Sequence, residues 1–378
     1  MNKSKYRLLH VFLDEKIVDT FISMMEVLFP EDSIYLILTH KDLLKNVKTV
    51  KNVMILNPHS RKFRDFISSQ IISFQEVVFH GLLGLNIYNQ FKHPNMSWVT
   101  WGGDLYETLL YHKGYRIYIN DYEYWKVRSG RVPTILYRFL WNLRGKINMY
   151  KKLDLINRIK RVYAMELDYN LLVHYFPKFN SLTHSYLTYY PIDEMLNEDI
   201  VNKFVSGENI WVNHSACASG NHVEIYKLIK NTHTQRVVYS PLSYGDSKFK
   251  SYFTDKGKQI FQEQFYPIID FLSRSEYYRL FLDANAFVFG HLRQCAEGNI
   301  IIALYLGGKC FLYKQNPLYE YYKGLGCIVY SIEDDLNKQS LEEPLSLSIR
   351  KLNRRLILDN FSYQRVMEIL RTNFSSSL

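Results

Sequence analysis

The chain has 378 residues and a formal net charge of +10, with 47% hydrophobic and 22% charged residues. This length exceeds what one ordinary hydrophobic core accommodates, so we expect two domains. The composition is typical of a folded soluble protein and excludes a disordered or fibrous chain. The 31 Tyr and 23 Phe are an unusual aromatic content and indicate ring-stacking sites or extensive amphipathic surface.

The four cysteines are scattered and form no C-x-x-C pair; they are Cys217, Cys295, Cys310 and Cys327. Such thiols favour a reduced cytosolic protein over a disulfide framework or a zinc site. Charged residues at 14–16 interrupt the apolar run that a signal peptide needs. The longest apolar stretch, 298–308, is about half a membrane span. We therefore expect a cytoplasmic protein with at most a peripheral contact to the inner face of the membrane.

The first half of the chain alternates β-rich runs with helical patterns, which predicts a parallel, doubly wound α/β sheet. The expected strands are residues 6–13, 33–39, 53–56, 76–80, 97–101, 161–165 and 185–188, and the clearest helices are 16–28 and 61–73. These elements predict an N-terminal domain over residues 1–190. A basic, aromatic insert at 113–161 interrupts it.

The insert at 113–161 carries the whole positive excess, with thirteen Lys and Arg against three acidic residues. From Val132 to Leu143, apolar side chains recur at helical spacing and predict an amphipathic helix. It is a membrane-surface helix, a core stripe with a solvated basic face, or a nucleic-acid site. We favour an anionic membrane and no nucleic acid, because no standard nucleic-acid motif is present. The expected membrane residues are Arg138, Trp141, Arg144, Lys146, Lys151 and Lys152.

The second half begins with a polar segment at 191–208, which is the expected linker. A second βα series predicts a C-terminal domain over residues 209–344, and a charged helical tail follows at 345–378. Its expected strands are 209–213, 236–240, 286–290, 309–313 and 327–330, and its expected helices are 222–231, 273–283 and 299–306. Such domains bind ligands at the carboxyl ends of strands, here in a cleft where the two domains face each other.

Two strand ends of the N-terminal domain carry candidate catalytic residues. The segment Trp101-Gly102-Gly103-Asp104-Leu105-Tyr106-Glu107 follows a strand and opens a helix, and its glycines permit a tight turn. Asp104 is a catalytic carboxylate, a helix N-cap in a capping box with Glu107, or both. His80 ends a strand in the same layer and is either a general base or a structural residue.

Three strand-end loops of the C-terminal domain have the polar composition of a phosphate or nucleotide site. Neither a P-loop nor a dinucleotide-binding motif is present. The third loop leads into an apolar helix, whose first turn either binds a diphosphate or only caps the helix. The candidate phosphate- or nucleotide-binding residues are Asn213, His214, Ser215, Ser240, Ser243, Tyr244, Arg293, Glu297, Gly298 and Asn299.

Together these motifs resemble glycosyltransferase family 56. The resemblance rests on Trp101–Glu107, on Asn213-His214-Ser215, on the segment from Arg293 to Gly307, and on Asn316-Pro317-Leu318-Tyr319. It covers most of the chain in order, and the string around Asp104 is its most specific part. Residues Gly103, Cys295 and Glu297 depart from the family's motifs.

The resemblance implies a GT-B fold with two Rossmann-like domains. It implies a TDP-linked deoxy-amino sugar donor, such as TDP-Fuc4NAc, and a polyprenyl-diphosphate glycan acceptor near Trp101, Tyr106 and Glu107. The product would belong to enterobacterial common antigen, O-antigen or another surface polysaccharide. No D-x-D pair suggests a metal, and no cofactor is expected, so Arg293 and helix N-termini would neutralise the diphosphate. Inversion or retention stays open. The alternatives are a transferase or epimerase for another nucleotide sugar, and a non-enzymatic membrane-surface protein.

Overall fold

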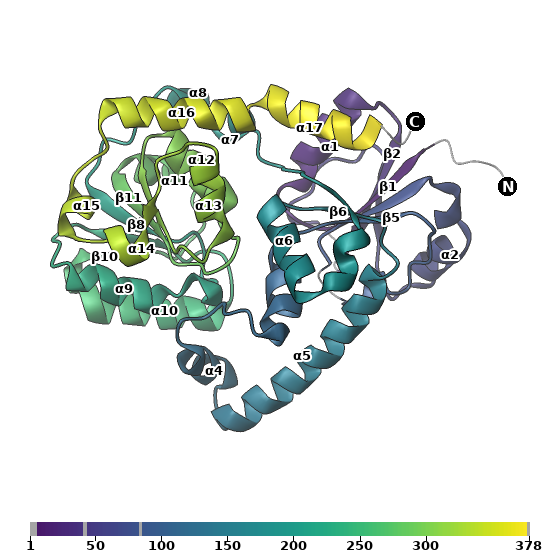
Figure 1. Cartoon of the computed structure of the whole chain (residues 1–378), viewed down its shortest axis with the longest axis horizontal. Coiled ribbons are helices and arrows are strands. Elements are labelled where there is room, and N and C mark those ends of the chain that lie inside the picture. The colour runs from purple at the N-terminus through teal and green to yellow at the C-terminus, as the bar shows by residue number, and fades with distance from the viewer. Residues whose placement is uncertain (1–5, 41–43, 83–84, 376–378) are drawn as a thin grey trace. The chain divides into compact units, whose positions relative to one another are not determined.

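The computed structural model describes residues 6–40, 44–82 and 85–375. The chain divides into two compact units, each with its own parallel sheet (Figure 1). The first unit comprises Met1–Tyr115, Asn142–Tyr189 and Gln364–Leu378. The second comprises Arg116–Trp141 and Tyr190–Tyr363.

The first unit contains a seven-stranded parallel sheet of order β3-β2-β1-β4-β5-β6-β7. Its strands are β1 (Leu8–Leu13), β2 (Ser33–Leu38), β3 (Val53–Leu56), β4 (Glu76–His80), β5 (Met96–Val99), β6 (Arg161–Tyr163) and β7 (Thr183–Ser185). The central strands β1, β4 and β5 are almost wholly buried, as expected for a parallel sheet covered on both faces. The strand order changes direction between β1 and β4. The carboxyl ends of these two strands therefore form the topological switch point, where doubly wound sheets bind ligands.

The helices of the first unit form where apolar side chains recur on one face. Its α-helices are α1 (Val18–Leu28), α2 (Arg61–Ser69), α3 (Leu85–Tyr88), α6 (Glu166–Tyr175) and α17 (Tyr363–Ser375), with shorter turns η1 (Ile71–Ser73), η3 (Tyr111–Lys113) and η4 (Pro177–Ser181). In α2, Ser60 caps the N-terminus by accepting a hydrogen bond from the N–H of Phe63, and Phe63 and Phe66 are buried. After β5 the chain enters η2 (Gly103–Leu110), a π-helix.

Helices α4 (Asp121–Ser129) and α5 (Thr134–Ile156) form most of the basic insert. The division between the units falls inside α5, after Trp141. The sequence predicted that the whole insert belongs to the first domain, but residues 116–141 pack with the second unit. Here Tyr124 stacks on Phe249 with ring centroids 5.5 Å apart.

The second unit contains a six-stranded parallel sheet of order β10-β9-β8-β11-β12-β13. Its strands are β8 (Asn209–Val212), β9 (Val238–Pro241), β10 (Phe265–Ile268), β11 (Ala284–Phe289), β12 (Lys309–Leu312) and β13 (Tyr330–Ser331). Numbered within the unit, this order is 3-2-1-4-5-6, the dinucleotide-fold order that the first six strands of the other sheet also follow. Its switch point lies at the carboxyl ends of β8 and β11.

Helices surround this second sheet. They are α7 (Ile192–Met195), α8 (Glu198–Val201), α9 (His222–Asn231), α10 (Ser247–Phe261), α11 (Arg274–Leu282), α12 (Glu297–Tyr305), α13 (Pro317–Gly324), α14 (Ile332–Asp335), α15 (Lys338–Glu342) and α16 (Leu347–Phe361), with the turns η5 (Ala218–Gly220) and η6 (Gln262–Gln264). The expected linker at 191–208 thus contains two short helices and belongs to the second unit. The expected tail divides, because α16 stays with the second unit whereas α17 from Gln364 on packs with the first.

Candidate functional site

Asp104 lies at the start of η2, and its side chain is fully buried. Its Oδ2 accepts hydrogen bonds from the backbone N–H of Leu82 at 2.8 Å and from Nε1 of Trp98 at 2.7 Å. Its Oδ1 accepts a hydrogen bond from the backbone N–H of Trp101 at 2.8 Å. The carboxylate therefore fastens the loop after β4 to the loop after β5. All three bonds use the oxygens that a general base would need, so this geometry favours a positioning role for Asp104.

The π-helix η2 has wide backbone turns, as in the hydrogen bond from the N–H of Tyr111 to the C=O of Tyr106. Such turns occur frequently at functional sites. Gly102 precedes η2 with φ at 74°, in the region that favours glycine. Because Gly102 occupies the N-cap position and makes no side-chain cap, the predicted capping box of Asp104 with Glu107 is wrong.

His80 at the end of β4 belongs to a buried polar chain. Its Nε2 lies 2.9 Å from Nδ1 of His10, and its Nδ1 lies 2.5 Å from the hydroxyl of Tyr189. That hydroxyl also accepts a hydrogen bond from Nε1 of Trp101 at 3.2 Å. Burial lowers the pKa of His80 well below its ordinary value and lowers the pKa of His10 to about 3. Both histidine rings are therefore neutral. Of the four side chains in this hydrogen-bonded series, Trp101 is the partly exposed one.

The predicted acceptor residues differ in exposure. Tyr106 is fully buried, and its hydroxyl donates a hydrogen bond to Oδ1 of the buried Asp168 at 2.5 Å. The prediction that Tyr106 contacts an acceptor is therefore wrong, because this side chain holds η2 against α6. Trp101 and Glu107 are partly exposed.

At the switch point of the second unit, Asn213 joins three segments. Its Oδ1 accepts a hydrogen bond from the N–H of Gly290 at 2.8 Å, and its Nδ2 donates to the C=O of Gly220 at 2.9 Å. Its φ of 60° lies in the left-handed region, which Asn tolerates better than most residues. A Cβ at Gly290 would lie 2.4 Å from the carbonyl oxygen of Gly220, so only glycine fits there. Asn213 is buried and holds the loops after β8 and β11 together.

The loop after β9 lies beside the loop after β8. The C=O of Tyr244 accepts a hydrogen bond from the N–H of Ala216 at 2.7 Å. Ser243 is partly exposed and Tyr244 is 50% exposed, so both side chains can meet a ligand. Ser240 cannot, because it is fully buried and its hydroxyl pairs with that of Tyr226 at 2.7 Å. The prediction of a donor contact from Ser240 is therefore wrong.

Arg293 after β11 is nearly buried, with 6% of its surface exposed. Its Nε donates to the hydroxyl of Ser219 at 3.2 Å, and its Nη1 donates to the C=O of Gln294 at 2.8 Å. A cation so close to the switch point provides positive charge for an anionic ligand. Ser219 belongs to the polar segment after the first strand of this domain, and the structure brings it against Arg293.

Helix α12 begins immediately after this arginine. Its N-cap residue Ala296 has φ at 64° and provides no side-chain hydrogen bond to the first turn. The first-turn residues Glu297, Gly298 and Asn299 are all partly exposed. The Asn299 Oδ1 accepts a hydrogen bond from the hydroxyl of Tyr277 at 2.8 Å. The helix therefore presents backbone N–H groups and partial positive charge to the loop of Arg293.

Cys295 lies between Arg293 and α12, near His214 and His291. Burial by itself raises the pKa of its thiol, but Arg293, His291 and His214 outweigh that effect and hold the pKa well below its usual range. None of the four cysteines, all of which lie in the described part of the chain, forms a disulfide. The thiol at position 295 thus stands close to the positive charge of Arg293 at the switch point.

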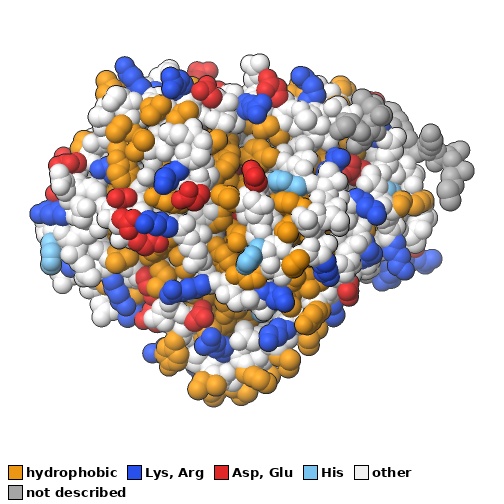
Figure 2. Space-filling view, in the orientation of Figure 1, with side chains coloured by type: hydrophobic (Ala, Val, Ile, Leu, Met, Phe, Trp, Pro, Cys, Tyr) orange, Lys and Arg blue, Asp and Glu red, His pale blue; other side chains and the backbone are white. Residues whose placement is uncertain are grey.

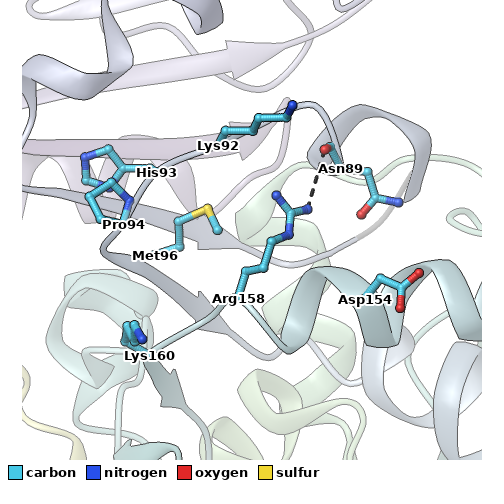
Figure 3. A pocket seen from close by; sticks show the side chains of 8 residues that line it. All are labelled: Asn89, Lys92, His93, Pro94, Met96, Asp154, Arg158 and Lys160. Atoms are coloured by element: carbon cyan, nitrogen blue, oxygen red, sulfur yellow. Dashed lines mark hydrogen bonds between the residues drawn. The ribbon is translucent and has the colours of Figure 1, made fainter.

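A separate hollow of about 700 Å³ lies in the first unit (Figure 3). It is lined by Asn89, Lys92, His93, Pro94, Met96, Asp154, Arg158 and Lys160. Met96 begins β5 and Lys160 precedes β6, so the hollow adjoins the amino ends of these strands. The Arg158 guanidinium is held by the backbone, with Nη1 donating to the C=O of Phe91 at 2.7 Å. This is the edge opposite the one where doubly wound sheets bind substrates.

Large apolar side chains are exposed along α5 and the residues before it, and we call them the α5 stripe. They are Val132, Ile135, Leu136, Phe139, Leu140, Leu143, Ile147 and Tyr150. Their spacing of three or four residues places them on one helix face. The described buried side chains of α5 begin only at Met149, so the interpretation of the stripe as core is wrong. Figure 2 shows hydrophobic side chains interspersed with basic ones over the region of α4 and α5.

Two of the predicted membrane residues do not belong to this surface. Lys152 is fully buried, and its Nζ donates to the C=O of Asp104 at 3.1 Å and to the hydroxyl of Thr108. Burial lowers the pKa of Lys152 to about 8. Trp141 is only partly exposed, and its ring packs edge-on against the buried Trp125. The exposed basic residues of the helix and its approach are Arg131, Arg138, Arg144, Lys146 and Lys151.

Among the described residues, none of the helices combines the length and apolar character required to cross a bilayer. No protein family profile matches the sequence, and no curated protein sequence matches it. The resemblance to family 56 therefore rests on the motifs alone.

Solved structures provide the informative similarities. The chain is similar to a sucrose-phosphate synthase from Thermosynechococcus elongatus, with a TM-score of 0.64 and 7% identity over 98% of this chain and 100% of that one. It is similar to the lipopolysaccharide outer core galactosyltransferase WaaB in its apo form, with a TM-score of 0.60 and 9% identity over 98% and 100% of the two chains. Anabaena HepE in complex with UDP-glucose gives a TM-score of 0.60 and 10% identity, also over 98% and 100%. The chain has the two-domain α/β GT-B fold.

Proposed function

We propose that this chain is a glycosyltransferase that moves a sugar from a nucleoside diphosphate to a lipid-linked glycan. The observation that carries the proposal is the convergence of three elements at the switch point of the second unit. They are the loop after β8, the nearly buried Arg293 after β11, and the uncapped N-terminus of α12. An anion is the ligand that this combination of charge and N–H donors favours.

A nucleoside diphosphate fits these donors in a specific way. The diphosphate lies against Arg293 and the first turn of α12, while Ser243 and Tyr244 adjoin the nucleoside. The partly exposed Glu297 and Asn299 meet hydroxyl or amide groups of the sugar. HepE, which shares this fold, forms a complex with UDP-glucose, and this supports a nucleotide sugar as the ligand class.

The motifs shared with family 56 favour a TDP-linked deoxy-amino sugar, similar to Fuc4NAc, as the donor. They also favour a polyprenyl-diphosphate glycan as the acceptor, in the synthesis of a surface polysaccharide. UDP is the principal alternative nucleotide, because HepE crystallised with it.

The acceptor belongs to the first unit in this proposal. Of the two carboxylates in the segment after β5, Glu107 is partly exposed and Asp104 is not. Glu107 is therefore the group that can contact an acceptor hydroxyl, and the partly exposed Trp101 can add a ring contact. Asp104 and His80 act as positioning residues, because both hold Trp101. The Asp104 carboxylate accepts a hydrogen bond from the backbone N–H of Trp101. His80 contacts the hydroxyl of Tyr189, which in turn binds the indole N–H of Trp101.

A lipid-linked acceptor requires contact with a membrane, and the α5 stripe suits that contact. Eight exposed apolar side chains flanked by five exposed basic residues match the acyl boundary and the anionic headgroups of a bilayer. Nucleic acid leaves the aliphatic face unexplained. A second copy of the chain would bring the same basic residues together, which disfavours self-association through this face.

The test of the donor site is calorimetric titration of the full chain with TDP, UDP, GDP and ADP. We expect one of these nucleotides to bind, and we expect Arg293→Ala to weaken its binding by about tenfold or more, since hydrogen bonds to charged groups contribute roughly 1.5–3 kcal/mol. Arg355→Ala is the matched control, because Arg355 is an exposed arginine of α16 in the same unit. Equal affinity in the two folded variants would refute the site.

A further inference from the structure

Three side chains that can bind metal ions meet at the switch point of the second unit. His214 follows β8, His291 follows β11, and Cys295 lies four positions beyond His291. One ring nitrogen of each histidine and the Sγ of Cys295 all lie within 4.8 Å of one another. We call these residues the His-His-Cys triad. The strand order creates it, because β8 and β11 are neighbours in the sheet although they are far apart in the sequence.

The histidines of the triad have buried nitrogen atoms without ordinary hydrogen bonds. His291 is fully buried, and neither of its ring nitrogens makes a hydrogen bond of normal geometry. The Nδ1 of His214 is also buried without such a partner, whereas its Nε2 lies 3.2 Å from the hydroxyl of Ser215. An unsatisfied buried polar atom costs roughly 1–3 kcal/mol, so native proteins usually provide a ligand or partner for it. The Cys295 thiol interacts with both rings, so the three possible ligand atoms already converge on one point, as the ligands of a single ion would.

We propose that His214, His291 and Cys295 bind a divalent metal ion of the zinc class. Zinc prefers tetrahedral nitrogen and sulfur ligands, with Zn–N near 2.0–2.1 Å and Zn–S near 2.3 Å. Such a site would place the donor atoms roughly 3.4–3.6 Å apart, and the described donor atoms lie within 4.8 Å of one another. The ion itself displaces the thiol proton, since a coordinating thiol is deprotonated.

Three protein ligands leave a fourth tetrahedral position open. Zinc sites with an open position bind water or a substrate atom, whereas purely structural sites have four protein ligands. His214 and Cys295 are partly exposed, so solvent can reach this side of the triad. A phosphate oxygen of a nucleoside diphosphate can take the fourth position, and this one consequence rests on the proposed function. The metal would then strengthen donor binding.

The test uses the full, tag-free chain, reduced and freed of metal, and titrated with Co²⁺ as the spectroscopic probe for zinc. We expect one tightly bound cobalt ion per chain, with tetrahedral visible bands and a thiolate-to-cobalt charge-transfer band in the near ultraviolet. Zinc should displace the cobalt and remove both signals. Cys295→Ser should abolish the charge-transfer band, and His214→Asn should weaken cobalt binding at least about tenfold, since even the loss of an outer partner of a metal ligand costs 10–100-fold.

Cys217→Ser is the matched control, because Cys217 is a partly exposed thiol in the same unit that does not belong to the triad. This variant should keep the full cobalt spectrum. A wild-type chain without a charge-transfer band, or a band that survives Cys295→Ser, would overturn the proposal. If Cys295→Ser does not fold, unchanged cobalt affinity in a folded His214→Asn variant would overturn it as well. No nucleotide is present in these titrations, so their outcome is independent of the donor site.

Discussion

Replacing Asp104 by Asn separates a positioning carboxylate from a catalytic base. The carboxylate accepts three hydrogen bonds from N–H donors and is fully buried. An amide keeps one acceptor oxygen and turns its NH₂ group toward at least one of those donors. The variant therefore loses at least one charge-assisted bond and leaves one buried N–H unpaired.

The expected loss of stability follows from these contacts. Hydrogen bonds to charged groups contribute roughly 1.5–3 kcal/mol, and an unpaired buried donor costs roughly 1–3 kcal/mol. Because the two effects overlap, we expect Asp104→Asn to destabilise the first unit by about 2–4 kcal/mol. For a domain of 150–250 residues this corresponds to a fall in Tm of roughly 4–16 °C.

Differential scanning calorimetry measures this loss, and Asp154→Asn provides the control, because Asp154 is an exposed carboxylate of the same unit. We expect the control to change Tm by no more than about 2 °C, as surface substitutions usually stay within 0.5 kcal/mol. An Asp104→Asn chain with unchanged Tm and turnover lowered about 100-fold or more would refute the positioning role. Asp104 would then act chemically, despite its burial.

Three further predictions concern titration and the membrane. Burial lowers the pKa of His10, His80 and His222, so the unfolded chain binds more protons below about pH 6.5. Stability should therefore fall as the pH drops from about 6.5 toward 4, by up to about 1.4 kcal/mol per pH unit for each histidine, and His80→Gln should flatten this dependence in urea unfolding. The pKa of Lys152 is lowered from 10.5 to about 8, so the cost of burying its charge is complete below pH 8 and is relieved as the pH rises. Wild type should therefore gain stability relative to Lys152→Met as the pH rises from about 8 toward 10. Finally, replacing five basic residues together by Gln should weaken binding to anionic liposomes about 100-fold or more at low salt, since each basic group contributes about 1 kcal/mol. These residues are Arg131, Arg138, Arg144, Lys146 and Lys151.

Each of these predictions has a control or an outcome that would contradict it. For the histidines it is His59→Gln, an exposed position that should leave the pH dependence unchanged. Parallel pH profiles for wild type and Lys152→Met would contradict the pKa shift of this lysine. For the membrane, Phe139→Ser with Leu140→Ser should also weaken liposome binding, and binding that depends on the charges alone would contradict insertion of the α5 stripe.

The sequence predicts the sheets well because their signals are local. Strands β3 and β4 and helix α9 have the bounds that the apolar patterns indicate, and most other strands differ by one to three residues. The sequence does not predict strand β10, because Pro267 interrupts a short β-rich run. The sheet tolerates this proline because β10 is an edge strand. Helix α10 was missed although buried Phe249, Phe253 and Phe261 follow one helical face.

The side-chain roles could not be predicted in the same way, because they depend on contacts between distant segments. The sequence places Asp104 and Ser240 at strand ends, but only the fold determines that Trp98 and Tyr226 occupy their polar atoms. The same holds for Lys152, whose helical spacing does not indicate that it turns toward the C=O of Asp104. His291 follows a strand of the second sheet much as His80 ends one of the first, so the same sequence signal can identify it.

The most direct test of the central claim is sugar transfer itself. The full chain is incubated with a radiolabelled nucleotide sugar, TDP-Fuc4NAc first and UDP-sugars next, and with vesicles that carry a polyprenyl-diphosphate glycan. We predict that label enters the lipid fraction with release of an equal amount of nucleoside diphosphate, and that Arg293→Ala reduces this transfer whereas Arg355→Ala does not. Nucleotide binding without label in the lipid fraction, for every donor and acceptor tested, would contradict the assignment as a transferase to lipid-linked glycans.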